Sequence, residues 1–87
     1  MQTIQTRIRD FINETFPSTT AEEIPADQSL FDTGIIDSIG VLTLVTWIEQ
    51  EFEIVVDDDD VVPENLDSIG QLTRYVHEKR TAAGLAP

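Results

Sequence analysis

The chain of 87 residues has a formal net charge of −12 and contains no cysteine. Its length allows one small domain with a modest core, and the lack of cysteine excludes disulfides, thiolate metal sites and a cysteine nucleophile. The charge excludes nucleic-acid binding, which needs cations to displace phosphate counterions, and it disfavours anionic membrane surfaces. No basic region and apolar run of the kind found in signal peptides follows Met1. The longest apolar stretches are also far shorter than the roughly 20 residues that span a bilayer. We therefore expect a cytoplasmic protein with no membrane insertion.

A first helix is predicted over residues 3–15, and Pro17 ends it. Its apolar residues recur at helical spacing and form one stripe: Ile4, Ile8, Phe11 and Ile12. The connection that follows, residues 17–36, is too long for a compact domain unless apolar side chains anchor it. The expected anchors are Ile24, Leu30, Phe31, Ile35 and Ile36, with a short helical turn near residues 26–30.

A second helix is predicted from Ser38 to about Glu51, with Asp37 as its N-cap. It is apolar around much of its circumference, so we expect it at the centre of the packing. Its predicted buried face consists of Leu42, Val45, Ile48 and Phe52. Gly40 costs on the order of 1 kcal/mol relative to alanine in a helix. We expect its missing side chain to leave room for a backbone or ligand near Ser38.

A short third helix is predicted around residues 59–64, with the acids of residues 57–60 capping its start. A fourth starts at Asp67 or Ser68 and reaches about Arg80. Its inward residues should be Ile69, Leu72, Tyr75 and Val76. The expected fold is all-α, a small four-helix bundle of three main helices and one short helix, with a long loop between the first two. We expect residues 1–80 to form the domain and residues 81–87 a flexible tail.

Ser38 is the residue that carries the most chemical information. If Asp37 is the N-cap, Ser38 occupies the first helical position, where backbone N–H groups lack partners and the helix dipole favours an anion. A phosphate esterified to the Ser38 hydroxyl would be stabilised there, and no neighbouring residue is suited to transform it. The tetrapeptide Asp-Ser-Ile-Gly recurs at residues 67–70, so Ser68 is a rival, and an aspartate N-cap explains either copy. The contexts differ, since only the first copy precedes the most apolar helix.

The order of these elements resembles that of acyl and peptidyl carrier proteins. The residues that carry the likeness, roughly from Ile4 to Lys79, are Leu30-Phe31, Gly34, Asp37-Ser38-Ile39, the helix ending in residues 47–52, and Pro63-Glu64-Asn65-Leu66 before the last helix. The resemblance implies that Ser38, and not Ser68, bears 4′-phosphopantetheine derived from coenzyme A, with Asp37 as a supporting cap or recognition residue. It implies a non-catalytic chain that carries an acyl or aminoacyl group as a thioester. Because neither end has a long Pro- or Ala-rich linker, we expect a free-standing protein, and no feature of the sequence demands more than a monomer. The implied partners are a phosphopantetheinyl transferase, an acyl- or aminoacyl-adenylating ligase and downstream acyl-processing enzymes.

The candidate partner-recognition residues are Ile39, Gly40, Thr43 and Trp47. Fatty-acid carriers usually place acids two and five positions after the serine, where this chain has Gly40 and Thr43. That departure favours a likeness to D-alanyl and peptidyl carriers, which an AMP-forming ligase loads with an amino acid or small carboxylic acid. Trp47 fits either the core or an apolar contact with a partner.

Two other classes of function remain open. From Asp37 to Asp67 the chain has ten acids and no Lys or Arg, which suits an unmodified acidic helical module that docks a basic partner. A small hydrolase would need His77 to reach a serine, although the Gly-x-Ser-x-Gly setting is missing. The run of acids at residues 57–60 lacks the spacing of a calcium loop, so we expect a capping cluster and no metal site.

Overall fold

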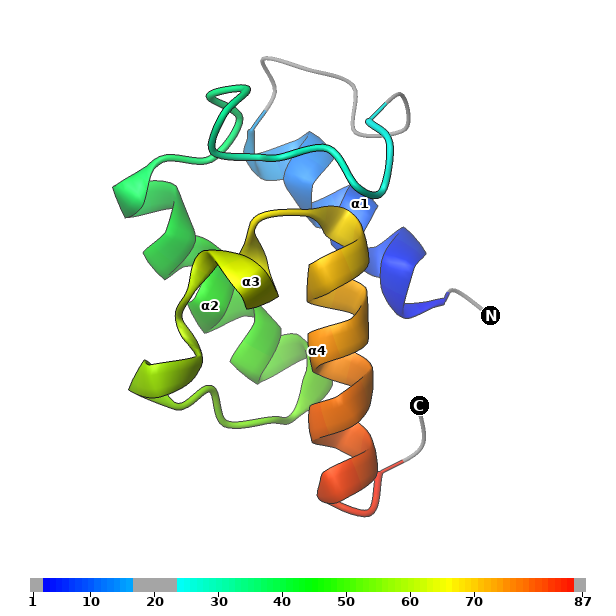
Figure 1. Ribbon diagram of the computed structural model, residues 1–87. Helices are drawn as coiled ribbons and strands as arrows, with labels where there is room; N and C mark the ends of the chain where they lie inside the picture. The colour runs from blue at the N-terminus through cyan, green and yellow to red at the C-terminus, as the bar shows by residue number, and fades with distance from the viewer. Residues whose placement is uncertain (1–2, 17–23, 86–87) are drawn as a thin grey trace.

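The structure is a computed structural model that describes residues 3–16 and 24–85. Within these ranges it contains no strand and four α-helices: α1 (Ile4–Thr15), α2 (Ser38–Phe52), α3 (Pro63–Leu66) and α4 (Ile69–Ala82) (Figure 1). A short 3₁₀ turn, η2 (Asp58–Asp60), precedes α3. The predicted all-α class is confirmed. None of the helices found in the described residues is long and apolar enough to cross a membrane.

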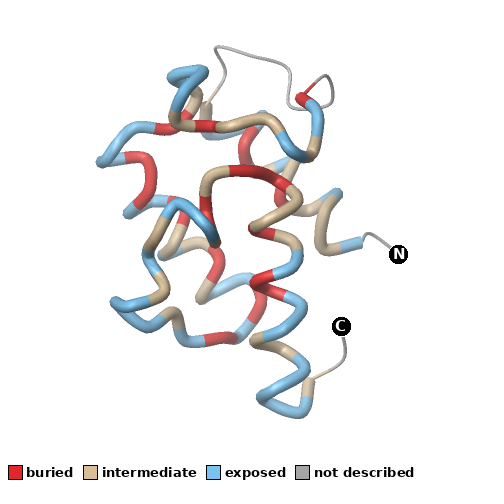
Figure 2. The backbone as a smooth tube through the Cα atoms, in the orientation of Figure 1, coloured by how far each residue is buried: buried red, intermediate tan, exposed pale blue. Residues whose placement is uncertain are grey.

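Helix α4 is the element around which the others pack. It contacts α1, α2 and α3, and residues 24–37, which lead into α2, cross over its N-terminal end (Figure 1). The buried stretches of all these elements face one shared interior (Figure 2). The residues with no exposed surface are Ile8, Ile12, Leu30, Leu44, Ile48, Phe52, Ile69, Leu72 and Val76.

Helix α1 begins where the sequence predicts. Thr3 is its N-cap, and the Thr3 hydroxyl accepts a hydrogen bond from the backbone N–H of Thr6 at 3.1 Å. The predicted apolar stripe is confirmed, because Ile8 and Ile12 are fully buried while the other two members, Ile4 and Phe11, pack against the core. The predicted stop at Pro17 lies outside the described residues, as do residues 18–23.

The long connection is anchored by the predicted side chains. Ile24, Leu30 and Ile36 are buried, and Phe31 and Ile35 pack against the core. The helical turn expected near residues 26–30 is a tight turn only, closed by the Gln28 N–H donating to the Pro25 carbonyl at 3.0 Å. Residues 24–36 therefore form an ordered arch over the bundle.

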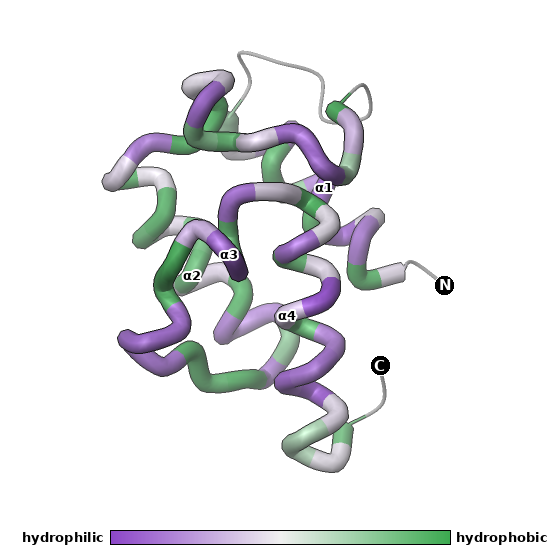
Figure 3. Tube along the Cα trace, viewed as in Figure 1, coloured by the Kyte–Doolittle hydropathy of each residue, from purple (hydrophilic) through white to green (hydrophobic). Residues whose placement is uncertain are grey.

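The predicted buried face of α2 is wrong at Leu42, which is 67% exposed. Val41 and Leu44 take its place in the core, together with the correctly predicted Ile48 and Phe52. Hydrophobic residues occur along much of the α2 trace, including its exposed first turns (Figure 3). Because apolar side chains occupy nearly every face there, periodicity cannot distinguish the inner face, and packing decides it.

The single third helix predicted around residues 59–64 is wrong, because the segment divides into η2 and α3. Pro63 is the first residue of α3, and a residue that precedes proline is driven into an extended conformation. Val62 has that conformation, with φ −134° and ψ 155°, and so no helix can pass through it. The acids do not cap either element, since neither makes a side-chain cap hydrogen bond.

Helix α4 starts with Ser68 as its N-cap and continues past the predicted end at Arg80 to Ala82. The predicted inward residues are confirmed as buried: Ile69, Leu72, Tyr75 and Val76. Lys79 and Arg80 lie in the last turn, where cations complement the helix dipole. The predicted tail at residues 81–87 thus begins inside α4, and its final residues, 86 and 87, lie outside the described part of the chain.

Candidate functional site

The start of α2 has the predicted cap. Asp37 has extended backbone angles, and its Oδ1 accepts a hydrogen bond from the Gly40 N–H at 2.7 Å. Its backbone carbonyl accepts from the Val41 N–H at 2.9 Å. Ser38 is therefore the first residue of a 15-residue helix, and the N–H groups of Ser38 and Ile39 have no acceptor within that helix.

Ser38 is exposed, and its hydroxyl makes no hydrogen bond to any residue that the structure describes. A nucleophile that must enter another enzyme's active site needs this kind of access. An anion esterified to this oxygen would lie in the positive field at the helix N-terminus, where N–H groups still lack partners. The residues present therefore fit a phosphodiester-linked group at this position.

The second Asp-Ser-Ile-Gly copy is used differently. Ser68 is only 6% exposed, and its Oγ accepts a hydrogen bond from the Gln71 N–H at 3.1 Å. An aspartate N-cap could by local chemistry explain either copy, but in the second copy the serine is the N-cap and Asp67 precedes it. Burial and this capping bond leave the Ser68 hydroxyl poorly placed to react with a separate enzyme.

Two large apolar side chains flank Ser38 at the surface. Ile39 is 75% exposed and Leu42 is 67% exposed. Ile39 was predicted as a recognition residue, whereas Leu42 was assigned to the core and so was missed. Its position at i+4 from Ser38, on the same side of the helix, is the signal that could have identified it.

Gly40 cannot serve as a contact for a partner protein, because it is buried. A Cβ atom built there would lie 2.9 Å from Cε1 of the Phe16 ring. The space beside Gly40 is therefore occupied by an aromatic side chain and not by another backbone segment. The missing side chain of Gly40 does leave space near Ser38, as predicted, but the prediction that a backbone segment or a ligand uses this space is wrong, because the Phe16 ring fills it.

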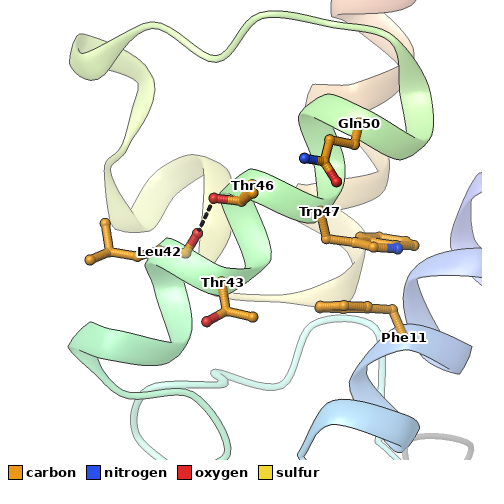
Figure 4. Close-up of a pocket in the computed structure, with 6 residues that line it drawn as sticks. All are labelled: Phe11, Leu42, Thr43, Thr46, Trp47 and Gln50. Atoms are coloured by element: carbon orange, nitrogen blue, oxygen red, sulfur yellow. Dashed lines mark hydrogen bonds between the residues drawn. The ribbon is translucent and has the colours of Figure 1, made fainter.

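The remaining recognition candidates lie on the outer side of α2. Thr43 is exposed, whereas Trp47 is half-buried and stacks on Phe11 with ring centroids 4.2 Å apart and planes 12° apart. A shallow hollow of about 430 Å³ opens beside this stack (Figure 4). It is lined by Phe11, Leu42, Thr43, Thr46, Trp47 and Gln50. Trp47 thus packs against the core and also lines this surface hollow, and its contact with a partner protein stays a prediction.

Two residues of the acidic run, Asp57 and Asp60, contact side chains of α4. Asp60 Oδ2 accepts a hydrogen bond from the Tyr75 hydroxyl at 2.7 Å, and Lys79 Nζ lies 3.5 Å from Asp57 Oδ2 and 3.9 Å from Asp60 Oδ2. Burial raises the pKa of the Tyr75 hydroxyl, and its bond to Asp60 and nearby negative charges raise that pKa further. In the described ranges, no group of three or more His, Asp or Glu residues is arranged to hold a metal ion.

The alternative of a small hydrolase, which needs His77 to reach a serine, finds no support in the contacts of His77. The side chain of His77 is exposed on α4, and none of the hydrogen bonds within residues 3–16 and 24–85 joins it to a serine. The Ser29 and Ser68 hydroxyls are engaged elsewhere, with Asp67 and with the Gln71 N–H.

The four-helix arrangement, with an exposed serine at the start of α2, defines a carrier-type domain. The family model described as a phosphopantetheine attachment site matches residues 2–76. This chain belongs to the family of phosphopantetheine-binding carrier proteins. Members of this family carry 4′-phosphopantetheine as their covalent prosthetic group.

Individual relatives agree with this membership. An acyl carrier protein of Beutenbergia cavernae is 31% identical over 75 residues, covering 86% of this chain and 88% of that protein. A D-alanyl carrier protein of Streptococcus uberis is 28% identical over 80 residues, covering 92% and 99%. The solved structure of KstB-PCP(apo) superposes with a TM-score of 0.67 at 30% identity, covering 93% of this chain and 86% of that one.

Proposed function

We propose that Ser38 carries the 4′-phosphopantetheine group and that the chain presents an acyl or aminoacyl thioester on it to partner enzymes. The observation that carries this proposal is the contrast between two identical tetrapeptides. Ser38 is exposed at the start of α2, and its hydroxyl makes no hydrogen bond to the described residues, whereas Ser68 is buried and its hydroxyl caps α4. When bound, the prosthetic group supplies a thiol on a flexible arm, which raises the local concentration of the tethered cargo at each partner.

The chain's own residues prepare Ser38 for transfer. Asp37 fixes the first turn of α2 by accepting from the Gly40 N–H, so the Ser38 hydroxyl projects from a defined position. Within a separate transferase the Ser38 oxygen forms a bond to the phosphorus of the phosphopantetheinyl group. The bond from that phosphorus to the remainder of coenzyme A breaks, so 3′,5′-ADP leaves, and the Ser38 hydroxyl gives up its proton. The chain performs no catalysis itself, and we propose that it acts as a monomer.

We propose further that the cargo is an amino acid or small carboxylic acid loaded by an adenylating ligase, before downstream acyl-processing enzymes use it. The exposed residues that follow Ser38 support this, because Ile39 and Leu42 offer an uncharged apolar surface. D-alanyl carrier proteins among the similar sequences support it as well. Since coenzyme A and ATP are both consumed in these steps, the cytoplasm is the compartment in which we expect them.

The test is intact mass after incubation with coenzyme A and a broad-specificity phosphopantetheinyl transferase. The wild-type chain and Ser68→Ala should each gain one phosphopantetheine, and Ser38→Ala should gain none. The Ser68→Ala protein is the matched control, because it loses the same hydroxyl from the same tetrapeptide. No gain in a folded, initially unmodified wild-type chain would favour the alternative, an unmodified acidic interaction module, in which Ser38→Ala leaves function intact.

A further inference from the structure

The proposed function assigns no role to the second Asp-Ser-Ile-Gly copy, residues 67–70. Because Ser68 is the N-cap of α4, the Asp67 side chain does not cap the helix and can bind other groups. The Asp67 carboxylate accepts hydrogen bonds from the Ser29 hydroxyl at 2.9 and 2.8 Å and from the Phe31 N–H at 3.0 Å. The Asp67 backbone carbonyl also accepts from the Leu30 N–H at 2.6 Å. A single residue before α4 therefore holds three consecutive residues of the connection between α1 and α2.

These hydrogen bonds continue toward the attachment site. The Ser29 hydroxyl accepts from the Asp32 N–H at 3.1 Å, which closes the turn that follows. The Leu30 carbonyl accepts from the Ile36 N–H at 3.2 Å. Ile36 is buried and directly precedes Asp37, the cap of α2. A continuous set of bonds therefore runs from Asp67 to the residue before the cap that positions Ser38.

The glycine of the same copy fixes the start of the arch. The Gly70 N–H donates to the Ala26 carbonyl at 2.8 Å, and a Cβ on Gly70 would lie 3.1 Å from that oxygen. Residues 67–70 thus hold the connection at Ala26 and again at residues 29–31. In the first copy, by contrast, the Asp37 carboxylate is engaged within its own helix, at the Gly40 N–H.

We propose that Asp67 is a positioning residue for the modification of Ser38, because it holds residues 29–36 in the conformation that a phosphopantetheinyl transferase binds. The inference rests on the proposed function of Ser38. Without the Asp67 carboxylate the arch samples other conformations, and the transferase's apparent affinity falls with the fraction of molecules that remain ordered. The chemistry at the Ser38 oxygen is unaffected once the complex has formed, so the change appears in KM and not in kcat.

The test compares KM and kcat of a broad-specificity transferase, with coenzyme A as co-substrate, for the wild-type chain and three variants. We expect Asp67→Ala to raise KM about tenfold with kcat unchanged, since hydrogen bonds to a charged group are the strong ones. Asp67→Asn should recover most of this loss, because its amide oxygen still accepts from the Phe31 N–H. Asp27→Asn removes the same charge from an exposed residue of the connection and should behave like the wild-type chain.

Amide hydrogen exchange at Leu30 and Phe31 reports the arch directly. Faster exchange there together with the raised KM, in a variant that circular dichroism shows to be folded, supports the inference. An unchanged KM in folded Asp67→Ala overturns it, and so does a fall in kcat alone. Should Asp67→Ala not fold, Ser29→Ala removes only the hydroxyl and must raise KM in the same way. A wild-type chain that accepts no group contradicts the proposed function itself, and this inference with it.

Discussion

Arg7 of α1 lies against the C-terminal end of α2, with its guanidinium carbon 4.5 Å from the centroid of the Phe52 ring. The same guanidinium donates to the Glu51 backbone carbonyl at 3.2 Å and forms an ion pair with the Glu51 carboxylate. Helix α2 has no basic residue in its own last turn, so its terminal carbonyls lack a local cation. Arg80 of α4 supplies a second one by donating to the Phe52 carbonyl.

Arg7→Ala should therefore lower the free energy of unfolding by about 1 kcal/mol, combining a cation–π contact with a partly solvent-screened ion pair. Arg7→Lys should recover little, because an ammonium group lacks the planar fork that reaches the ring and the carbonyl together. Urea denaturation followed by circular dichroism measures both. The control is Arg74→Ala, an exposed arginine on the same bundle, which should change stability by less than about 0.5 kcal/mol. Equal effects of Arg7→Ala and Arg74→Ala would contradict this role.

Tyr75→Phe should destabilise the chain by about 1 kcal/mol or more, because it deletes the hydroxyl that donates to Asp60 at 2.7 Å. The ring stays buried, so packing in the core is preserved. Thermal melting of Tyr75→Phe beside Asp60→Asn, which keeps an acceptor oxygen, separates the loss of this bond from the loss of a charge. A melting temperature unchanged in Tyr75→Phe would show that the bond contributes nothing.

Stability should also fall in alkali because of Tyr75. Burial and Asp60 raise the pKa of Tyr75 in the folded chain above its ordinary value of 10.0, so above about pH 10 the unfolded chain releases a proton that the folded chain keeps. The stability that protonated Tyr75 contributes to the folded chain is fully present below about pH 10 and is lost as the pH rises further. Tyr75 is the only tyrosine, so tyrosinate absorbance reports it alone. We expect ionisation to coincide with unfolding; ionisation well before unfolding would contradict this.

The two glycines of the repeated tetrapeptide should respond differently to alanine. Gly70→Ala should lower stability by about 1 kcal/mol, because its Cβ would press on the Ala26 carbonyl that the Gly70 N–H also binds. Gly40→Ala should be better tolerated, because its Cβ would meet the outer edge of the Phe16 ring, which can turn aside, and alanine favours the helix. Chemical denaturation of the two variants compares them. A larger loss in Gly40→Ala would contradict the assignment.

Added salt should raise the melting temperature. The ten acids from Asp37 to Asp67 have no Lys or Arg among them, and the cations that pair with three of these acids, Lys79 and Arg7, lie outside that stretch. Self-repulsion of this kind weakens as counterions screen it. Calorimetry between about 20 mM and about 500 mM NaCl should show a steady rise. A melting temperature that is flat or falls with salt would remove repulsion as a destabilising factor.

Local patterns in the sequence predicted the buried residues of a helix well where its apolar residues form one face and its polar residues another. The stripe at Ile8 and Ile12 and the inward set on α4 lie as predicted, because each helix has one apolar face. The inner face of α2 could not be predicted in this way, since Val41 and Leu42 are both apolar and only packing buries one and exposes the other. Val62 lies inside the predicted third helix but is extended in the structure, because the proline that follows it disfavours a helical conformation.

The candidate site shows the same division. Asp37 as a cap and Ser38 at the first helical position follow from residues that are neighbours in sequence. The role of Asp67 does not, because its partners Ser29 and Phe31 are 38 and 36 positions away. The two identical tetrapeptides thus begin their helices one residue apart. Residues 29–31 bind the aspartate of the second copy, so its serine caps the helix, whereas in the first copy the aspartate is the cap.

The central claim is that Ser38 is the attachment residue, and the most direct measurement is localisation of the added group without any mutation. The wild-type chain is incubated with coenzyme A and the transferase, digested, and sequenced by tandem mass spectrometry. We predict one phosphopantetheine per chain, with fragment ions that bracket it on Ser38 and leave Ser68 unmodified. The group on Ser68 or Ser29, or no group on a folded chain, would contradict the account.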